Sequence, residues 1–142
     1  MSLTIAAIKE RDAGERRVAL VPAVAERIKR LGCAVALETG AGVSSFYPDD
    51  TYKDTVIQSD VNTLMSTADV VLAVNPPAPD LIATMRPGSV LISFIYGRTH
   101  PDLVKALRDQ KITCFAIVLN RPNNRPHSRC TPSDTGPPSG CL

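Results

Sequence analysis

Short apolar runs and helical repeats alternate along the first 119 residues of the chain. Apolar runs rich in β-branched residues predict buried strands, and there are five: Leu3–Ile8, Cys33–Glu38, Asp69–Val74, Ser89–Tyr96 and Lys111–Leu119. Segments with apolar residues at helical spacing lie between them and predict helices: Pro22–Leu31, Asp60–Ala68, Ala78–Met85 and Pro101–Gln110.

Helix signals mark the ends of these segments. Pro22 suits a first helical position and Gly32 a helix end, while Val24, Ile28 and Leu31 recur on one predicted apolar face. Asp60 or Asn62 is the expected cap of the second helix.

The alternation of strands and helices predicts an α/β fold. We expect a Rossmann-like parallel sheet of about five strands, with right-handed crossovers and helices on both faces. Ligands gather at the carboxyl ends of the strands in such sheets. The loops after Ile8, Glu38, Val74, Tyr96 and Leu119 are therefore the candidate sites.

The pattern changes after Leu119. Residues 120–142 contain five prolines and two glycines, with almost no apolar side chain before Leu142. A segment of this kind neither buries area nor sustains a helix. The sequence therefore predicts one domain over residues 1–119 and an irregular, disordered tail rich in Pro, Arg and Ser over residues 120–142.

Composition and charge narrow the classes of partner. The chain is 44% hydrophobic and 21% charged, as soluble globular domains are. The chain has a net charge of +2, and the tail alone accounts for it, with three arginines and one acidic residue, Asp134. The rest of the chain is therefore neutral. Without a basic stripe, an apolar run of 18 residues or metal-ligand spacing, we expect no nucleic acid, no membrane insertion and no metal.

The cysteines and the start of the chain bear on its location. Cys33 and Cys114 lie in predicted strands and are interpreted as buried thiols in a reducing compartment. The start becomes charged too early for a signal peptide. We therefore expect a cytoplasmic protein.

Three loop motifs are candidates for chemistry. The stretch ETGAG (38–42) departs from the G-x-G-x-x-G spacing, so a tight turn is favoured over a phosphate cradle. The stretch NPPAP (75–79) fixes the exit of a strand. His100 precedes a helix and is interpreted as a cap or surface residue rather than a general base, and His127 lies in the tail.

The stretch GERRVALVP (14–22) places two arginines before an apolar run. Arg16 and Arg17 point to opposite sides if the segment is extended, so one of them faces the carboxyl edge of the sheet. A guanidinium there suits a carboxylate or a phosphate. On residue chemistry alone, a salt bridge within the protein is the favoured interpretation, and an anion site is the alternative.

Three longer stretches resemble a known family. IKERDAGERRVALVPAVAERIKRLGCAVALETGAG, ADVVLAVNPP and MRPGSVLISFIYGRTHPDLVKALRDQKITCFA follow one another in that order. They resemble the N-terminal domain of the alanine dehydrogenase and pyridine nucleotide transhydrogenase α-subunit family. Tyr96 after SFI, and NPP after the third strand, are more similar to the transhydrogenase branch, because alanine dehydrogenases have a catalytic histidine at the position of Tyr96.

The resemblance implies roles for particular residues. Arg17 matches the arginine that grips the substrate carboxylate in alanine dehydrogenases, so Arg17 and Tyr96 are the expected substrate-binding residues. The family's substrate-contacting lysine is replaced by Ala73, and Thr55–Ile57 stands where small residues are usual. We assign no catalytic, cofactor-binding or metal-binding residue.

The resemblance also implies what this chain lacks. The family continues after the last strand with P-R-x-x-R-A-Q and a dinucleotide-binding domain, and neither is present. The intact family transfers hydride between NAD(H) and NADP(H), coupled to proton translocation. We expect a truncated or divergent domain that alone binds neither cofactor and is inactive.

Two alternatives remain open: an alanine dehydrogenase-like fragment, and a non-catalytic dimerisation or interaction module. The expected partners are a second copy or other transhydrogenase subunits. Through such subunits the chain would lie at the periphery of a membrane.

Overall fold

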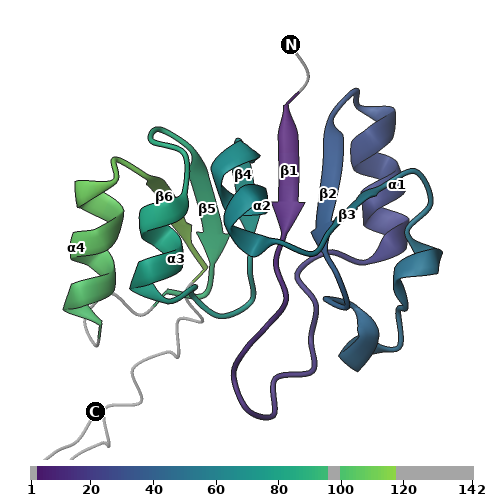
Figure 1. Cartoon of the computed structure of the whole chain (residues 1–142), viewed down its shortest axis with the longest axis horizontal. Helices are drawn as coiled ribbons and strands as arrows, with labels where there is room; N and C mark the ends of the chain where they lie inside the picture. Colours follow the sequence, from purple (N-terminus) through teal and green to yellow (C-terminus); the bar gives the residue numbers. More distant parts are fainter. Residues whose placement is uncertain (1–2, 96–99, 118–142) are drawn as a thin grey trace, which may run out of the picture.

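The protein forms one parallel sheet with helices packed on it (Figure 1). A computed structural model describes residues 3–95 and 100–117. The strands run in the order β3-β2-β1-β4-β5-β6, and every neighbouring pair is parallel. Their bounds are β1 Thr4–Ala7, β2 Ala34–Glu38, β3 Val56–Gln58, β4 Val70–Leu72, β5 Val90–Ser93 and β6 Thr113–Ala116.

Four α-helices and two short 3₁₀ turns connect the strands. The bounds are α1 Pro22–Arg30, η1 Val43–Ser45, η2 Asp49–Thr51, α2 Val61–Thr67, α3 Pro79–Thr84 and α4 Pro101–Asp109. The predicted helices are thus confirmed to within a few residues. Asp60 is confirmed as the cap of α2, because its carboxylate accepts the N–H groups of Asn62 and Thr63.

The sheet has six strands where the sequence predicted about five. The additional strand is β3, three residues long and lying at the edge beside β2. Its first residue, Val56, is 62% exposed. A run this short at a sheet edge shows no alternation of buried and exposed positions, so the apolar pattern did not reveal it.

The predicted apolar face of α1 is right for Ile28 and wrong for Val24 and Leu31. Val24 is 42% exposed and Leu31, at the end of the helix, is 81% exposed. The helix contacts the sheet through buried Ala25 and half-buried Ile28. The contact centres on the small side chain of Ala25, and it leaves Val24 and Leu31 in solvent.

Two apolar cores lie on the two faces of the sheet. The larger core joins the strands to α2, α3 and α4, with fully buried Met65, Ile82 and Leu91 among its members. The smaller joins β1 and β2 to α1 and contains Leu20 and Leu37. Helices therefore lie on both faces, as expected, with α1 on one and α2, α3 and α4 on the other. Cys33 and Cys114 are only half-buried, so their interpretation as buried thiols is wrong.

The strand order sets the position of the candidate site. It reverses between β1 and β4, because β2 and β3 extend to one side of β1 while β4, β5 and β6 extend to the other. The carboxyl ends of these strands meet at one edge, the lower edge in Figure 1. Ligands of doubly wound sheets bind at this switch point. Among the described residues, no helix is long and apolar enough to span a membrane.

Candidate functional site at the carboxyl edge of the sheet

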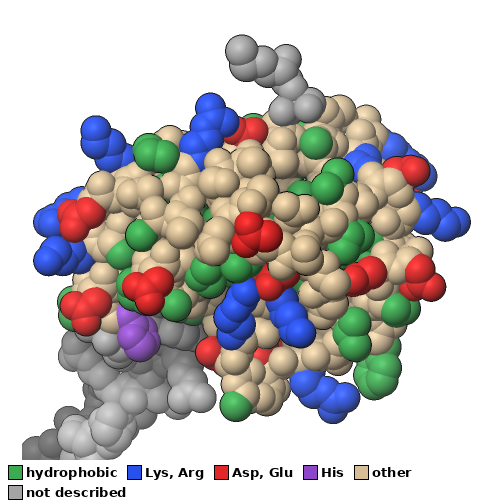
Figure 2. All heavy atoms as spheres, in the orientation of Figure 1, with side chains coloured by type: hydrophobic (Ala, Val, Ile, Leu, Met, Phe, Trp, Pro, Cys, Tyr) green, Lys and Arg blue, Asp and Glu red, His purple; other side chains and the backbone are tan. Residues whose placement is uncertain are grey.

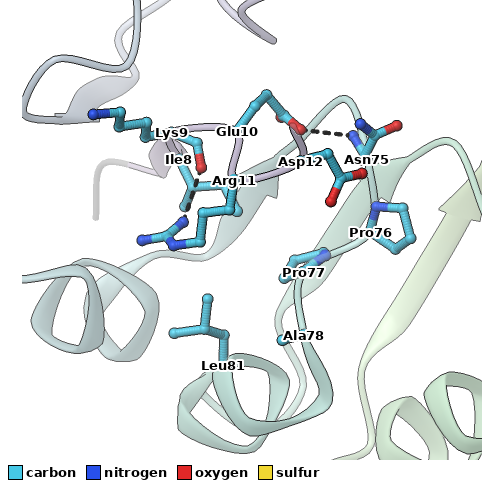
Figure 3. Close-up of a pocket in the computed structure, with 10 residues that line it drawn as sticks. All are labelled: Ile8, Lys9, Glu10, Arg11, Asp12, Asn75, Pro76, Pro77, Ala78 and Leu81. Atoms are coloured by element: carbon cyan, nitrogen blue, oxygen red, sulfur yellow. Dashed lines mark hydrogen bonds between the residues drawn. The ribbon is translucent and has the colours of Figure 1, made fainter. Parts of the chain in front are cut away.

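The long loop between β1 and α1 is fastened across the switch point by Glu10. The Glu10 carboxylate accepts the backbone N–H of Val74 at 2.6 Å, where the chain leaves β4. It also accepts the backbone N–H of Asn75 at 3.0 Å (Figure 3). Burial raises the pKa of Glu10 above its ordinary value, and the two N–H donors partly offset this shift. The nearby charges of Glu15 and Asp12 raise the same pKa further.

A second carboxylate fastens the exit of β1 to the end of β2. Glu38 is 8% exposed, and its carboxylate accepts the backbone N–H of Lys9 at 2.7 Å. Its other oxygen lies 2.7 Å from the guanidinium of Arg11, which also donates to the Lys9 carbonyl. The buried charge of Glu38 therefore has both a cation and a backbone donor as partners.

A third carboxylate closes the glycine-rich turn after β2. The N–H of Gly40 lies 3.0 Å from each carboxylate oxygen of Asp49. Gly42 is packed so closely that a Cβ there would lie 2.8 Å from the Tyr52 hydroxyl oxygen. The turn thus directs its glycine N–H toward a side chain of the protein, which agrees with a tight turn rather than a phosphate cradle.

Basic side chains gather over the same edge. Figure 2 shows Lys and Arg side chains at the lower centre of the molecule, with acidic groups beside them. Lys9 and Arg11 line a cavity of about 200 Å³ between the β1–α1 loop and the β4–α3 loop (Figure 3). Pro76, Pro77 and Leu81 form its other wall. Glu10 and Asp12 also line the cavity, which therefore combines charges of both signs with a rigid apolar side.

Arg17 lies at the strand ends, close to the exits of β4 and β5. Its guanidinium bonds the Glu15 carboxylate at 2.6 and 2.9 Å and lies over the ring of Phe94, 5.7 Å from its centroid. The Asn75 side chain donates to the same carboxylate at 3.3 Å. The Arg17 side chain is 63% exposed, so solvent reaches its guanidinium.

The hydrogen bonds with Arg17 lower the pKa of Glu15 to about 2 from its ordinary value of 4.5. Glu15 therefore stays ionised over the whole physiological range. The salt-bridge interpretation of GERRVALVP accounts for these contacts. The substrate-binding role expected of Arg17 stays a prediction.

The other candidate residues named by the sequence are Tyr96, His127, Ala73 and His100. Tyr96, the second expected substrate-binding residue, lies outside the described residues, as do His127 and the predicted tail. Ala73, at the position of the family's lysine, is buried. His100 is exposed and stands at the N-cap position of α4, where its side chain makes no capping hydrogen bond.

His100 and Asp102 line a second cavity of about 530 Å³, together with Asp12 and prolines of the β4–α3 loop. Within residues 3–95 and 100–117, no group of three or more His, Cys, Asp or Glu side chains is placed to hold a metal ion.

The sequence analysis missed the three carboxylates that accept these backbone N–H groups, Glu10, Glu38 and Asp49. The sequence did carry a signal for two of them, because Glu10 follows a predicted strand and Glu38 ends one, and the ends of strands are where the site was expected.

These features define a doubly wound α/β domain whose carboxyl edge is closed by its own carboxylates. The chain belongs to the alanine dehydrogenase/PNT N-terminal domain family, whose model matches residues 6–125.

Relatives from both branches of the family are similar to this chain. The first part of the NAD(P) transhydrogenase subunit alpha of Rhodospirillum rubrum is 37% identical over 124 residues, which are 82% of this chain and 32% of the relative. Alanine dehydrogenase of Bacillus subtilis is 32% identical over 110 residues, or 76% of this chain and 29% of the relative. The chain thus spans about a third of the length of these relatives.

Solved structures agree with the fold. The transhydrogenase from Sinorhizobium meliloti matches with a TM-score of 0.74 and 30% identity, over 80% of this chain and 33% of that one. An L-alanine dehydrogenase matches with a TM-score of 0.75 at 22% identity, over 80% of this chain and 32% of that one, which shows the fold alone.

Proposed function

We propose that the chain acts as the N-terminal domain of a transhydrogenase-type α subunit and that it does not hold a dinucleotide by itself. The observation that carries the proposal is that backbone N–H groups at the carboxyl edge of the sheet already donate to carboxylates of the protein itself. A dinucleotide pyrophosphate binds backbone N–H groups at the switch point and at the N-terminus of the first helix. Here Glu10 takes the N–H groups of Val74 and Asn75, and Asp49 takes that of Gly40.

The charge of these groups argues in the same direction. A bound pyrophosphate would lie against two carboxylates and would be repelled by them. The first helix offers little in exchange, because α1 begins with Pro22, which has no N–H, and follows a long loop with seven charged residues. The chain then lacks the means to bring a nicotinamide to a reacting group, and we expect it to be inactive alone.

In this proposal, NAD(H) and NADP(H) are held by other parts of the assembly, and the nicotinamide supplies the hydride chemistry. The present chain supplies one wall of the cleft, with Arg17 at the strand ends facing an anionic group. It would work in the cytoplasm, or at a membrane periphery through partner subunits.

Calorimetric titration of the purified chain with NADH and NAD⁺ tests the proposal. We expect no binding below about 1 mM, which corresponds to less than about 4.1 kcal/mol of binding free energy. Binding at micromolar concentration would overturn it. Glu10→Ala frees the two N–H groups after β4, so a gain of weak binding by this variant alone would support the carboxylate argument.

A second candidate is an alanine dehydrogenase-like fragment, and the position of Arg17 favours it. The missing cation at Ala73 removes a charge-assisted hydrogen bond worth about 1.5–3 kcal/mol. We expect pyruvate or alanine to leave the melting temperature unchanged, and Ala73→Lys to allow a small upward shift. If neither chain responds at high ligand concentration, the fragment hypothesis fails and the contacts of Arg17 serve the structure of the loop.

A further inference from the structure

The cavity of about 530 Å³ between the β4–α3 loop and the start of α4 has no role in the candidate site described above. Its volume is in the range of pockets that enclose small ligands, about 300–1,000 Å³. Most of its lining is apolar and comes from six residues: Pro76, Pro77, Ala78, Pro79, Pro101 and Leu103. We call it the proline cavity.

The proline cavity offers few hydrogen-bond donors. Four of its lining residues are prolines, which have no backbone N–H. The backbone N–H of Asn75 already donates to Glu10, and the side-chain amide of Asn75 donates to Glu15. Among the described residues, no Lys or Arg lines this cavity. An anion therefore finds little in it to bind.

Two carboxylates make the proline cavity acidic. Asp12 and Asp102 both line it, and both are exposed. Neither takes part in the four ion pairs formed within residues 3–95 and 100–117. Figure 3 shows the Asp12 carboxylate pointing toward Pro76 and Pro77. Asp102 lies in the first turn of α4, where its charge offsets the positive end of the helix dipole. The cavity therefore suits a cation.

The guanidinium group of arginine fits this combination of acid and apolar wall. It is always charged, and its five N–H groups match the acceptor oxygens of carboxylates. It is also more weakly hydrated than the ammonium of lysine, so it loses less on contact with apolar side chains. We therefore expect the occupant of the proline cavity to carry arginine.

The chain itself carries such arginines after its last strand. Residues 120–142 contain three arginines and one acidic residue, whereas the rest of the chain is neutral. Arg121 and Arg125 each stand directly before a proline, in the stretch NRPNNRP (120–126). A residue before a proline favours an extended backbone. The charge of this stretch is thus complementary to that of the proline cavity.

The starting point of this stretch lies within reach of the cavity. The strands are parallel, so β6 ends at the same carboxyl edge, and the N–H of Ile117 bonds the Ser93 carbonyl at the end of β5. From β6 to β4 is two strand spacings, about 10 Å. Arg121 and Arg125 follow Ile117 by four and eight residues, which extend to about 13 and about 26 Å.

We propose that the proline cavity is the docking site for the chain's own residues 120–126, which bind it through the guanidinium groups of Arg121 and Arg125. A short tether gives the segment an effective concentration of about 1 mM at the cavity, so a weak interaction suffices. Docking through two side chains needs neither a helix nor a strand in the segment, in keeping with its composition. The proposal does not depend on the proposed function.

Titration with a synthetic peptide tests the proposal. The peptide has the sequence of residues 118–129, and the titrated protein is the full chain with Arg121→Gln and Arg125→Gln, which leaves the cavity open to the peptide. NMR chemical shifts of the isotope-labelled chain report where the peptide binds. The amide signals of Ala78 and Leu103 should move. We expect a dissociation constant below about 1 mM at low salt, because docking of the tethered segment requires that affinity.

Two further double variants, made in the same chain, test the carboxylates. Asp12→Asn with Asp102→Asn should weaken binding of the peptide about tenfold, at about threefold for each exposed ion pair. Asp50→Asn with Asp80→Asn changes the net charge equally, at exposed positions outside the cavity lining, and should leave binding unchanged. Asp80 matches Asp102 closely, because each follows the proline that opens its helix. Circular dichroism melts establish that all variants fold.

The wild-type chain supplies the last comparison. Its own segment should compete with the peptide and weaken binding at least about twofold. Three results would each overturn the proposal: no shift at Ala78 and Leu103, equal weakening by the two double variants, or equal binding by the wild-type chain and the arginine variant. A wild-type dimer that the arginine variant dissociates would overturn it in favour of the segment of a second copy. NADH titration measures a different property, so failure here leaves the proposed function standing.

Discussion

Replacing Glu10 by alanine tests how the carboxyl edge is held together. The substitution removes the acceptor of two backbone N–H groups, at 2.6 Å from Val74 and 3.0 Å from Asn75. Hydrogen bonds to a charged group contribute about 1.5–3 kcal/mol each. Two such bonds set an upper limit, and two effects reduce it.

The first is that Glu10 is only half-buried, so water can reach the freed N–H groups. The second is that burial penalises its charge, as the raised pKa indicates. We therefore expect Glu10→Ala to lower the free energy of unfolding by about 2–3 kcal/mol, below the sum of the two bonds. Glu10→Gln keeps one acceptor oxygen, so its free energy of unfolding should lie between those of Glu10→Ala and the wild type.

Urea unfolding at pH 7, followed by circular dichroism, measures this loss. The midpoint should move to lower urea while the slope stays constant, since the compactness of the two states is unchanged. Glu26→Ala is the matched control, because Glu26 is an exposed carboxylate on α1, and its effect should stay within about 0.5 kcal/mol. If Glu10→Ala changes stability no more than Glu26→Ala does, the carboxylate does not fasten the loop and the reasoning is refuted.

Three further predictions concern the same edge. The low pKa of Glu15, about 2 against an ordinary 4.5, contributes stability above pH 4.5 that is lost as the pH falls toward 2. The urea midpoint should therefore fall less between about pH 5.5 and about pH 2.5 in Glu15→Gln than in the wild type, and equal falls would contradict the pairing with Arg17. Gly42→Ala should destabilise by about 2–4 kcal/mol through overpacking, whereas Gly14→Ala, with open space but a φ of +88°, should cost only about 1 kcal/mol; thermal melts compare them. Tyr52→Phe removes a buried hydroxyl that donates to a backbone carbonyl at 2.8 Å, so we expect a loss of about 1–2 kcal/mol, and unchanged stability in urea would show that the bond contributes nothing.

The sequence predicted the parts of this fold that depend on local pattern. Each of the five apolar runs contains a strand, and each helical repeat contains a helix, because burial on both faces of a parallel sheet requires continuous apolar segments. The edge strand β3 was missed because its residues are only partly shielded from solvent. The face of α1 was misassigned at Val24 and Leu31, because helical spacing alone does not say which of two adjacent stripes meets the sheet.

The candidate site was less predictable, since its contacts join residues far apart in the chain. Glu10 meets Val74 across 64 positions, and Glu38 meets Lys9 across 29. Loop sequences show that charged groups are present without showing which backbone donors they reach. The proximity of Arg17 and Glu15 was foreseeable because the two are nearly adjacent, but the degree of exposure was not.

The place of β1 in the sheet has a consequence for how the chain is made. This first strand lies at the centre, and its flank is completed only by β4, with Thr4 bonded to Asp69 across 65 positions. A parallel sheet has no hairpins, so each pairing waits for a whole crossover to be synthesised. At about 5–20 residues per second on the ribosome, β1 waits several seconds for β4 to follow it. During that interval its apolar side chains are available to chaperones, and the rate of translation between β1 and β4 becomes a determinant of folding yield.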